Sequence, residues 1–217
     1  MSFAVLSSLS FSIFIAGMLS IIRFNKINDQ YYPFVFSLWI GCLNEVISLY
    51  FAKNYLPSSI NNNIYILIES ILIAFLFKNL GLFNSRKIIF YGIIVGFICE
   101  WLIENFILGQ ISVFNAYFSI FSSFVIVLMS ISTINELIIR NSSRIFANAT
   151  FLLCLGFIVF FTYQVLVYAF WIYGAQSDTG FLLNIFTILI YINLLTNLIY
   201  AVAVLWMPKK LEFTLPY

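Results

Sequence analysis

The sequence predicts an all-α membrane protein, a bundle of seven transmembrane helices that forms one domain over residues 1–217, with no soluble domain. Three observations predict this fold. Hydrophobic residues make up 63% of the chain, whereas soluble domains contain roughly 45–50% apolar residues. Seven apolar stretches are close to or above the length of about 20 residues that crosses a hydrocarbon core. The basic residues lie almost entirely in alternate loops, and all the loops are short.

The four prolines of the chain lie at the edges of the expected spans or in loops, so no helix interior should be broken. This counts against a transporter with discontinuous helices, which carries Gly/Pro interruptions near the midplane. The spans are expected at residues 3–22, 34–52, 62–80, 88–108, 112–136, 148–172 and 181–206.

The first two expected spans carry stripes of small and polar residues. No basic residue precedes the first span, which is typical of an uncleaved anchor rather than of a signal peptide. In the second span, Glu45 lies about 16 Å above the cytoplasmic start, close to the midplane. The stripes should face other helices, because helices in lipid associate through close packing and polar contacts. Their members are Ser8, Ser12, Ala16 and Ser20 in the first span, and Ser37, Gly41, Asn44, Glu45 and Ser48 in the second.

The third and fourth spans bring three more carboxyl groups. The third span runs inward and places Glu69 about 10 Å below the outer edge. In the fourth, Glu100 lies about 18 Å and Glu104 about 24 Å above the cytoplasmic start. Gly92 and Gly96 precede them at four-residue steps, which predicts a close approach of another helix on this face. Both glutamates should therefore face protein and not lipid.

The last three spans carry amides, hydroxyls and phenols in place of charges. Gln164 lies about 24 Å up its span, in the same layer as Glu69. A second group, on the seventh span, is most simply explained by hydrogen bonds between helices. The polar residues are Asn115, Ser119, Ser122 and Ser123 in the fifth span, Gln164, Tyr168 and Trp171 in the sixth, and Asn193, Asn197 and Tyr200 in the seventh.

The basic residues predict the orientation. Nine of the ten fall on one side of the expected bundle, and only Lys53 falls on the other. The positive-inside rule then puts the amino terminus outside and the carboxyl terminus inside. We expect a multi-pass protein of a bacterial inner membrane, because the Phe-, Ile- and Asn-rich composition is typical of AT-rich bacterial genomes. The nine residues are Arg23, Lys26, Lys78, Arg86, Lys87, Arg140, Arg144, Lys209 and Lys210.

The glutamates inside the apolar spans are the strongest functional clue. An ionisable group inside a bilayer is costly, so each indicates a functional site with a partner. Glu100 and Glu104, on adjacent turns, cannot both be cheaply ionised, so at least one should be protonated or share a cation. We expect Glu45, Glu69 and Glu100 to share a cavity in the outer half; a polar network that only locks helix packing is the alternative. The candidate ligand-binding residues are Glu45, Glu69, Glu100, Glu104, Asn44, Gln164, Tyr168 and Asn115.

Several absences narrow the function. The chain has no histidine, which excludes membrane zinc hydrolases with His ligands, and its three cysteines lack a metal-binding spacing. The last span has no internal lysine for a retinal Schiff base. No phosphate-binding glycine loop, nucleophile elbow or nucleic-acid motif occurs. We therefore expect no catalytic residue, no metal, no cofactor and no nucleic-acid partner.

Three functions stay open. The favoured one is an outward-facing acidic cavity that binds or transports a small cationic or proton-coupled solute, with the lipid bilayer as its other partner. The second is a membrane sensor or assembly subunit that acts through a membrane protein partner. The third is a metal-independent intramembrane hydrolase, which ranks last because no activated nucleophile accompanies the carboxyls.

Parts of the chain resemble a known group of proteins. They are Asn44-Glu45-Val46 with Leu49-Tyr50, Tyr65 with Glu69, and the run Asn197–Ala201 before Trp206 and Pro208. They are similar to short seven-helix inner-membrane proteins, mostly of Bacteroidota type, without assigned function. The resemblance covers much of the chain at sparse positions, and it implies a bacterial membrane protein and no particular activity.

Overall fold

The computed structural model describes residues 9, 11–114, 116–140, 148–173 and 179–210, and over these residues it is built of helices. Six helices are long and apolar enough to cross a membrane, which is the architecture of a multi-pass membrane protein. The first expected span lies partly outside the described residues. Its described part, α2 (Ile13–Arg23), is too short to be judged as a span. Ser8, Asn115 and Arg144 also lie outside the described residues.

The helices from α3 to α8 agree with the expected spans to within a few residues. Two short 3₁₀ turns, Phe24–Lys26 and Asp29–Tyr31, connect α2 to α3. A π-helical segment, η3, continues α5 directly. The bounds are α3 (Tyr32–Lys53), α4 (Ser59–Asn79), α5 (Lys87–Leu102), η3 (Ile103–Leu108), α6 (Ala116–Arg140), α7 (Ala149–Tyr173) and α8 (Thr179–Trp206).

Local sequence fixes the end of α4. Gly81 follows it with a φ of +95°, a conformation that favours glycine. The Leu82 amide donates to the Phe77 carbonyl and the Gly81 amide to the Lys78 carbonyl, both at 3.1 Å. These two bonds form a Schellman motif, which satisfies carbonyls that the helix end leaves unpaired. The chain can then turn directly into α5.

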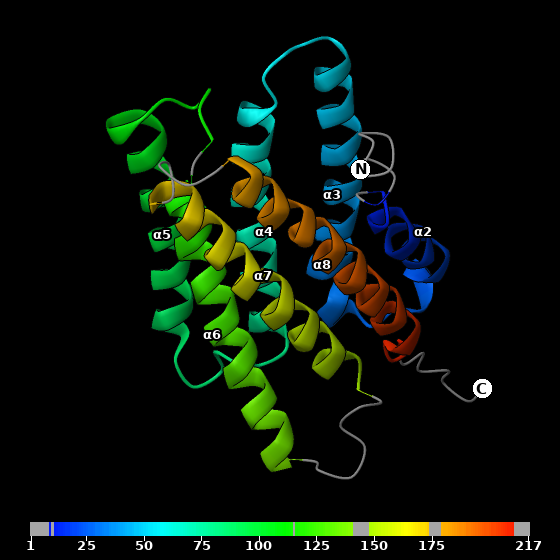
Figure 1. Cartoon of the computed structure of the whole chain (residues 1–217). Coiled ribbons are helices and arrows are strands. Elements are labelled where there is room, and N and C mark those ends of the chain that lie inside the picture. The colour runs from blue at the N-terminus through cyan, green and yellow to red at the C-terminus, as the bar shows by residue number, and fades with distance from the viewer. Residues whose placement is uncertain (1–8, 10, 115, 141–147, 174–178, 211–217) are drawn as a thin grey trace, which may run out of the picture.

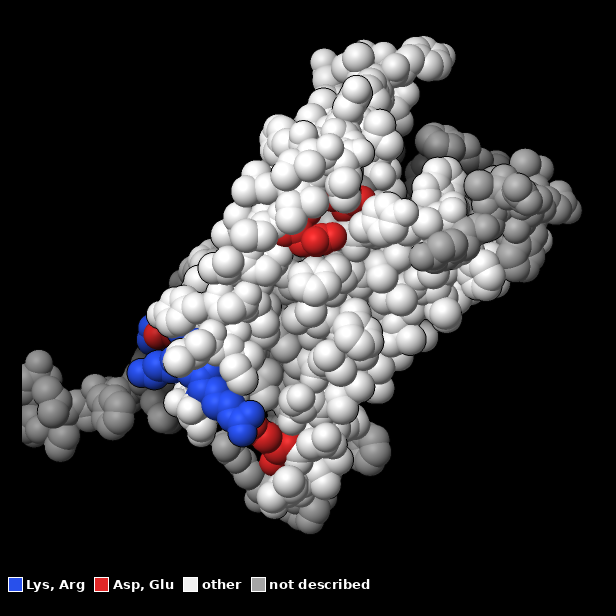
Figure 2. All heavy atoms as spheres, turned by 90° about the vertical axis from the view of Figure 1, so that its left-hand side faces the viewer, with Lys and Arg blue, Asp and Glu red and all other residues white. Residues whose placement is uncertain are grey.

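The helices close a ring. α2 packs on both α3 and α8, α3 on α4, α6 on α7, and α7 on α8, while α5 packs on α4 and α6. Successive helices run in opposite directions, as Figure 1 shows, so the ends of α2, α4, α6 and α8 lie at one end of the bundle. The basic residues follow those helix ends, whereas Lys53 ends α3 at the opposite end. On the face in Figure 2, Lys and Arg atoms gather toward the lower end, and acidic atoms occur both beside them and at mid-height.

The end of α8 is tied to the connection between α2 and α3. The Arg23 guanidinium donates to the carbonyls of Val204, at 2.6 Å, and Leu205, in the last turn of α8. A cation there also meets the negative end of the helix dipole. Next to it, Ile27 pairs with Lys209 in an isolated antiparallel bridge. The basic end of the ring is thus held by backbone contacts between distant parts of the chain.

The expected close helix approach at Gly92 and Gly96 is wrong. A Cβ on Gly92 would meet nothing within 4 Å, and one on Gly96 would meet only the Phe121 ring, at 3.9 Å. Tight contacts lie on other helices: a Cβ would come within 2.5 Å of the Ile13 side chain at Gly41 of α3, and within 2.5 Å of the Tyr200 ring at Gly156 of α7. The spacing of the two glycines is therefore incidental, and Gly156 is the position where a missing side chain lets α8 approach.

Candidate functional site

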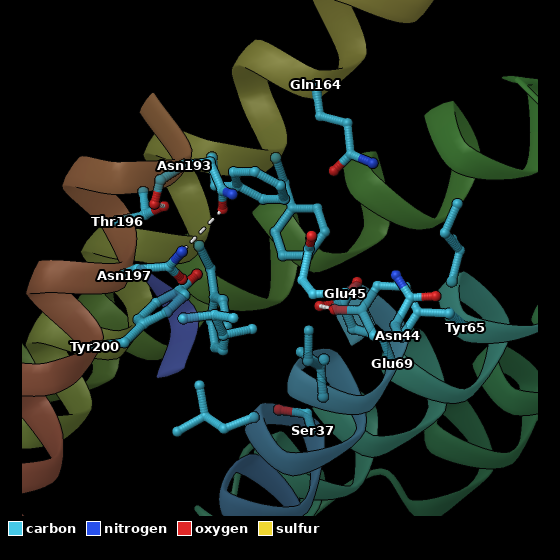
Figure 3. Close-up of a pocket in the computed structure, with 18 of the residues that line it drawn as sticks. Ser37, Asn44, Glu45, Tyr65, Glu69, Gln164, Asn193, Thr196, Asn197 and Tyr200 are labelled. Carbon is cyan, nitrogen blue, oxygen red and sulfur yellow. Dashed lines mark hydrogen bonds between the residues drawn. The ribbon is translucent and has the colours of Figure 1, made fainter. Parts of the chain in front are cut away.

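An internal cavity of about 230 Å³ lies between α2, α3, α4, α7 and α8. Figure 3 shows side chains from α3, α4, α7 and α8 pointing into it from different sides. Its polar lining comes mainly from the central turns of these helices. Asn193, for example, is 14 residues from the start of α8 and 13 from its end. The cavity therefore lies about midway along the interior of the bundle, and it is only partly enclosed, since Glu45 and Glu69 are both half-buried.

Glu69 and Glu45 supply the two carboxyl groups of the cavity. Glu69 is ten residues from either end of α4, about 15 Å along the axis from each. Its Oε1 accepts a hydrogen bond of 2.6 Å from the hydroxyl of Tyr65, one turn earlier. Glu45, in the middle of α3, has no hydrogen-bond partner among the described residues. One carboxyl is thus held in place by a phenol, and the other is not.

Gln164 contributes an unpaired acceptor. Its side chain on α7 is only 6% exposed and points into the cavity in Figure 3. Its Oε1 is buried and accepts no hydrogen bond within the described part of the chain. A buried polar atom without a partner costs about 1–3 kcal/mol. The Gln164 oxygen therefore offers an acceptor to a ligand in the cavity that carries an N–H or O–H donor.

Hydrogen bonds hold the polar side chains of α8 in place. The Asn197 amide nitrogen donates to the hydroxyl of Ser12, at 2.8 Å, and to the side-chain oxygen of Asn193, at 3.3 Å. The Thr196 hydroxyl donates to carbonyls one turn back in its own helix. The expected interhelical hydrogen bonding on this helix is present between Asn197 and Ser12. Asn193, Thr196 and Asn197 also line the cavity.

Three aromatic rings separate the polar part of the cavity from the basic end of the bundle. Phe34, Phe157 and Tyr200 come from α3, α7 and α8, and their ring centroids lie 5.3–5.9 Å apart. Each lies in the half of its helix that is nearer the basic end. All three residues are buried, and Phe34 is only 1% exposed. They form an apolar floor on that side.

Amides and hydroxyls connect α3 and α4 on the other side of the two carboxyls. Asn61 Nδ2 donates to the side-chain oxygen of Asn44 at 2.6 Å, and the Ser48 hydroxyl to that of Asn62 at 3.4 Å. Asn44 and Asn62 also line the cavity. The α3 and α4 part of the lining is therefore polar toward the Lys53 end, where Phe114 and Tyr168 add an aromatic pair with ring centroids 5.0 Å apart.

The charges of the cavity are all of one sign. None of the described residues that line it is Lys or Arg. Within the described part of the chain, no group of three or more His, Cys, Asp or Glu side chains could hold a metal ion. An ionised carboxylate in such a low-dielectric site needs a compensating cation or proton. Glu45 and Glu69 have none from the surrounding protein.

Five of the eight candidate residues line this cavity, namely Asn44, Glu45, Glu69, Gln164 and Tyr168. Glu100 and Glu104 do not line it, so the structure does not bring Glu100 together with Glu45 and Glu69. Asn115 lies outside the described residues.

Glu104 has a different position from the one expected. Its two carboxylate oxygens accept from the backbone amides of Tyr117, at 3.0 Å, and Phe118, at 2.5 Å, in the first turn of α6. These amides have no partner inside the helix, and an anion there also meets the positive end of the helix dipole. Glu104 thus caps α6. The π-helical turn that begins at Ile103 carries it away from the face that a continuous α-helix would give it.

Other residues of the cavity were not among the candidates. Tyr65, Asn193, Thr196, Asn197 and Tyr200 line it as well. The four-residue steps Tyr65–Glu69 and Asn193–Asn197 were the signal available in the sequence, because such pairs share a helix face. Sequence alone could not tell a stripe that bonds a neighbouring helix from one that also borders a cavity.

Comparisons with protein-family models, with curated proteins and with solved structures found no match. The resemblance to short seven-helix inner-membrane proteins therefore stays a prediction, and the function has to be argued from the cavity itself.

Proposed function

We propose that the chain is a polytopic membrane protein whose acidic cavity faces outward and binds or transports a small cationic or proton-coupled solute. The observation that carries the proposal is the pair Glu45 and Glu69 in one interior cavity without a lining Lys or Arg. Removing one partner of a buried ion pair is costly because it leaves a buried charge uncompensated. A cation or a proton that enters the cavity supplies that compensation.

The size of the cavity favours a small solute. Its volume of about 230 Å³ is below the roughly 300–1,000 Å³ of pockets for drug-sized ligands. It would hold roughly seven water molecules at about 30 Å³ each. A large lipid or peptide substrate is therefore not favoured.

The aromatic floor supports an outward opening. Phe34, Phe157 and Tyr200 close the side toward the basic end, which the positive-inside rule places in the cytoplasm. The opposite side carries the amides of Asn44 and Asn62, which an entering hydrated ion can contact, beside the rings of Phe114 and Tyr168. With this orientation the solute comes from outside a bacterial inner membrane.

Thermal unfolding of the purified protein, titrated with cations and with pH, tests the proposal. A ligand at a hundred times its Kd should stabilise the folded state by about 2.7 kcal/mol. We expect this stabilisation in the wild type and in Glu100→Gln, a matched control outside the cavity. It should be lost in Glu45→Gln and Glu69→Gln.

The opposite pattern would identify the carboxyls as packing groups. In that case the double variant Glu45→Gln/Glu69→Gln would be more stable than the wild type and would keep any response to cations. Counterflow of a bound cation in proteoliposomes then separates transport from binding alone.

A further inference from the structure

We propose that the solute is a protonated primary amine, whose three N–H groups donate to Glu45, Glu69 and the side-chain oxygen of Gln164. This inference rests on the proposed function and names the chemical class of its ligand. It starts from the unpaired oxygen of Gln164, which is buried, points into the cavity and has no donor among the described residues.

The unpaired groups of the cavity are acceptors. The Glu45 carboxylate has no hydrogen bond among the described residues, and Glu69 receives one, from Tyr65, on one of its two oxygens. An alkylammonium group offers three N–H donors and no acceptor. It therefore supplies both what the carboxylates need, a positive charge, and what Gln164 needs, a donor.

Other cations fit less well. A quaternary ammonium ion has no N–H group and would leave Gln164 unpaired. A transition metal ion requires more ligands than two carboxyls, and no group of three or more His, Cys, Asp or Glu side chains exists within the described residues. A proton alone would neutralise a carboxyl without filling a cavity of about 230 Å³.

The apolar walls suit the carbon part of an amine. Phe160 and Phe161 of α7 and Tyr200 of α8 line the cavity beside the polar groups. Aromatic faces attract organic cations through the ring quadrupole, and more strongly once the cation has lost its water. A short alkyl chain can lie against these rings while its ammonium group faces the carboxylates.

Binding of four small probes to the purified full-length chain in detergent tests the inference by isothermal titration calorimetry. The probes are n-butylammonium, tetramethylammonium, potassium and neutral n-butanol, near neutral pH, where an alkylamine is protonated. We expect n-butylammonium to bind at least tenfold more tightly than each of the others.

The Gln164→Leu variant tests the role of the amide oxygen. It should weaken n-butylammonium about tenfold or more, the effect of losing a hydrogen bond to a charged group, and leave tetramethylammonium within about twofold. The ratio of the two affinities is measured within one variant, so a general loss of stability does not mimic the effect. If Gln164→Leu does not fold, Gln164→Met gives the same comparison. Glu100→Gln is the control that should keep the wild-type ratio.

Three results would overturn the inference. Tetramethylammonium or potassium binding as tightly as n-butylammonium, with dependence on Glu69, would refute it and leave the proposed cation site standing. Equal binding of n-butanol would show that the cavity recognises only the alkyl chain. Absence of a response to every cation and to pH would remove the proposed function as well.

Discussion

Replacement of Glu104 by alanine should destabilise the protein without affecting its response to cations. The carboxylate is 6% exposed and accepts from two amides at the start of α6. Loss of a helix cap costs about 0.5–2 kcal/mol, and hydrogen bonds to a charged group contribute about 1.5–3 kcal/mol each. Because water can reach part of the vacated space, we expect a loss of about 2–4 kcal/mol in the free energy of unfolding.

The Glu104→Gln variant refines the test. Glutamine keeps one acceptor oxygen but presents an NH₂ group to the second backbone amide, so one of the two bonds is lost. We expect a loss of about 1–2 kcal/mol. The matched control is Glu100→Gln, one turn earlier on the same helix, which should stay within about 0.5 kcal/mol of the wild type.

Unfolding in mixed detergent micelles, followed by circular dichroism, measures these differences. The cation titration is repeated on each variant, since a residue that caps α6 should not change ligand affinity. The assignment of Glu104 as a cap fails if Glu104→Ala unfolds like the wild type, or if Glu100→Gln loses as much stability. It also fails if Glu104→Ala retains its stability but loses the cation response.

Two further predictions concern the bundle. Gly156→Ala should lower the free energy of unfolding by about 1–3 kcal/mol, because its methyl group would overlap a buried ring, whereas Gly92→Ala, in open space, should be neutral or up to about 1 kcal/mol more stable. Thermal unfolding of both variants measures this, and an equal loss in both would contradict it. In a variant without the native cysteines, single cysteines at Asn54 and Lys87 should react with an impermeant maleimide from opposite sides of the membrane. Labelling of both from the same side would refute the topology.

The helices were predictable because apolar length alone largely determines a membrane span. The start of α4 is one difference, since the expected span began at residue 62 and left out Ser59, Ile60 and Asn61. In the structure these residues are helical, and Asn61 bonds the side chain of Asn44 in α3. The helix therefore begins at Ser59, and Glu69 lies in its middle and not near the outer edge.

The candidate site was predictable where helix periodicity continues unbroken. Glu45 and Glu69 lie on regular helices, so the depth of both could be worked out, and the stripe of Ser37 and Gly41 also gave the inward face of Glu45. Glu104 follows a change from α- to π-helix, and its partners are backbone amides of another helix. Neither feature has a local sequence signal. The orphaned oxygen of Gln164 likewise depends on what four other helices leave empty around it.

The bond between Arg23 and the carbonyl of Val204 joins residues that are 181 positions apart. α2 is synthesised before α8, so the guanidinium has no α8 carbonyls to bind until the 181 positions that separate the two residues have been translated. The hydroxyl of Ser12 likewise has no Asn197 amide to accept from before α8 is made. Until then the bundle is open between α2 and α8, and Arg23 and Ser12 lack these hydrogen-bond partners. Packing of α8 against α2 then closes the ring and forms both hydrogen bonds.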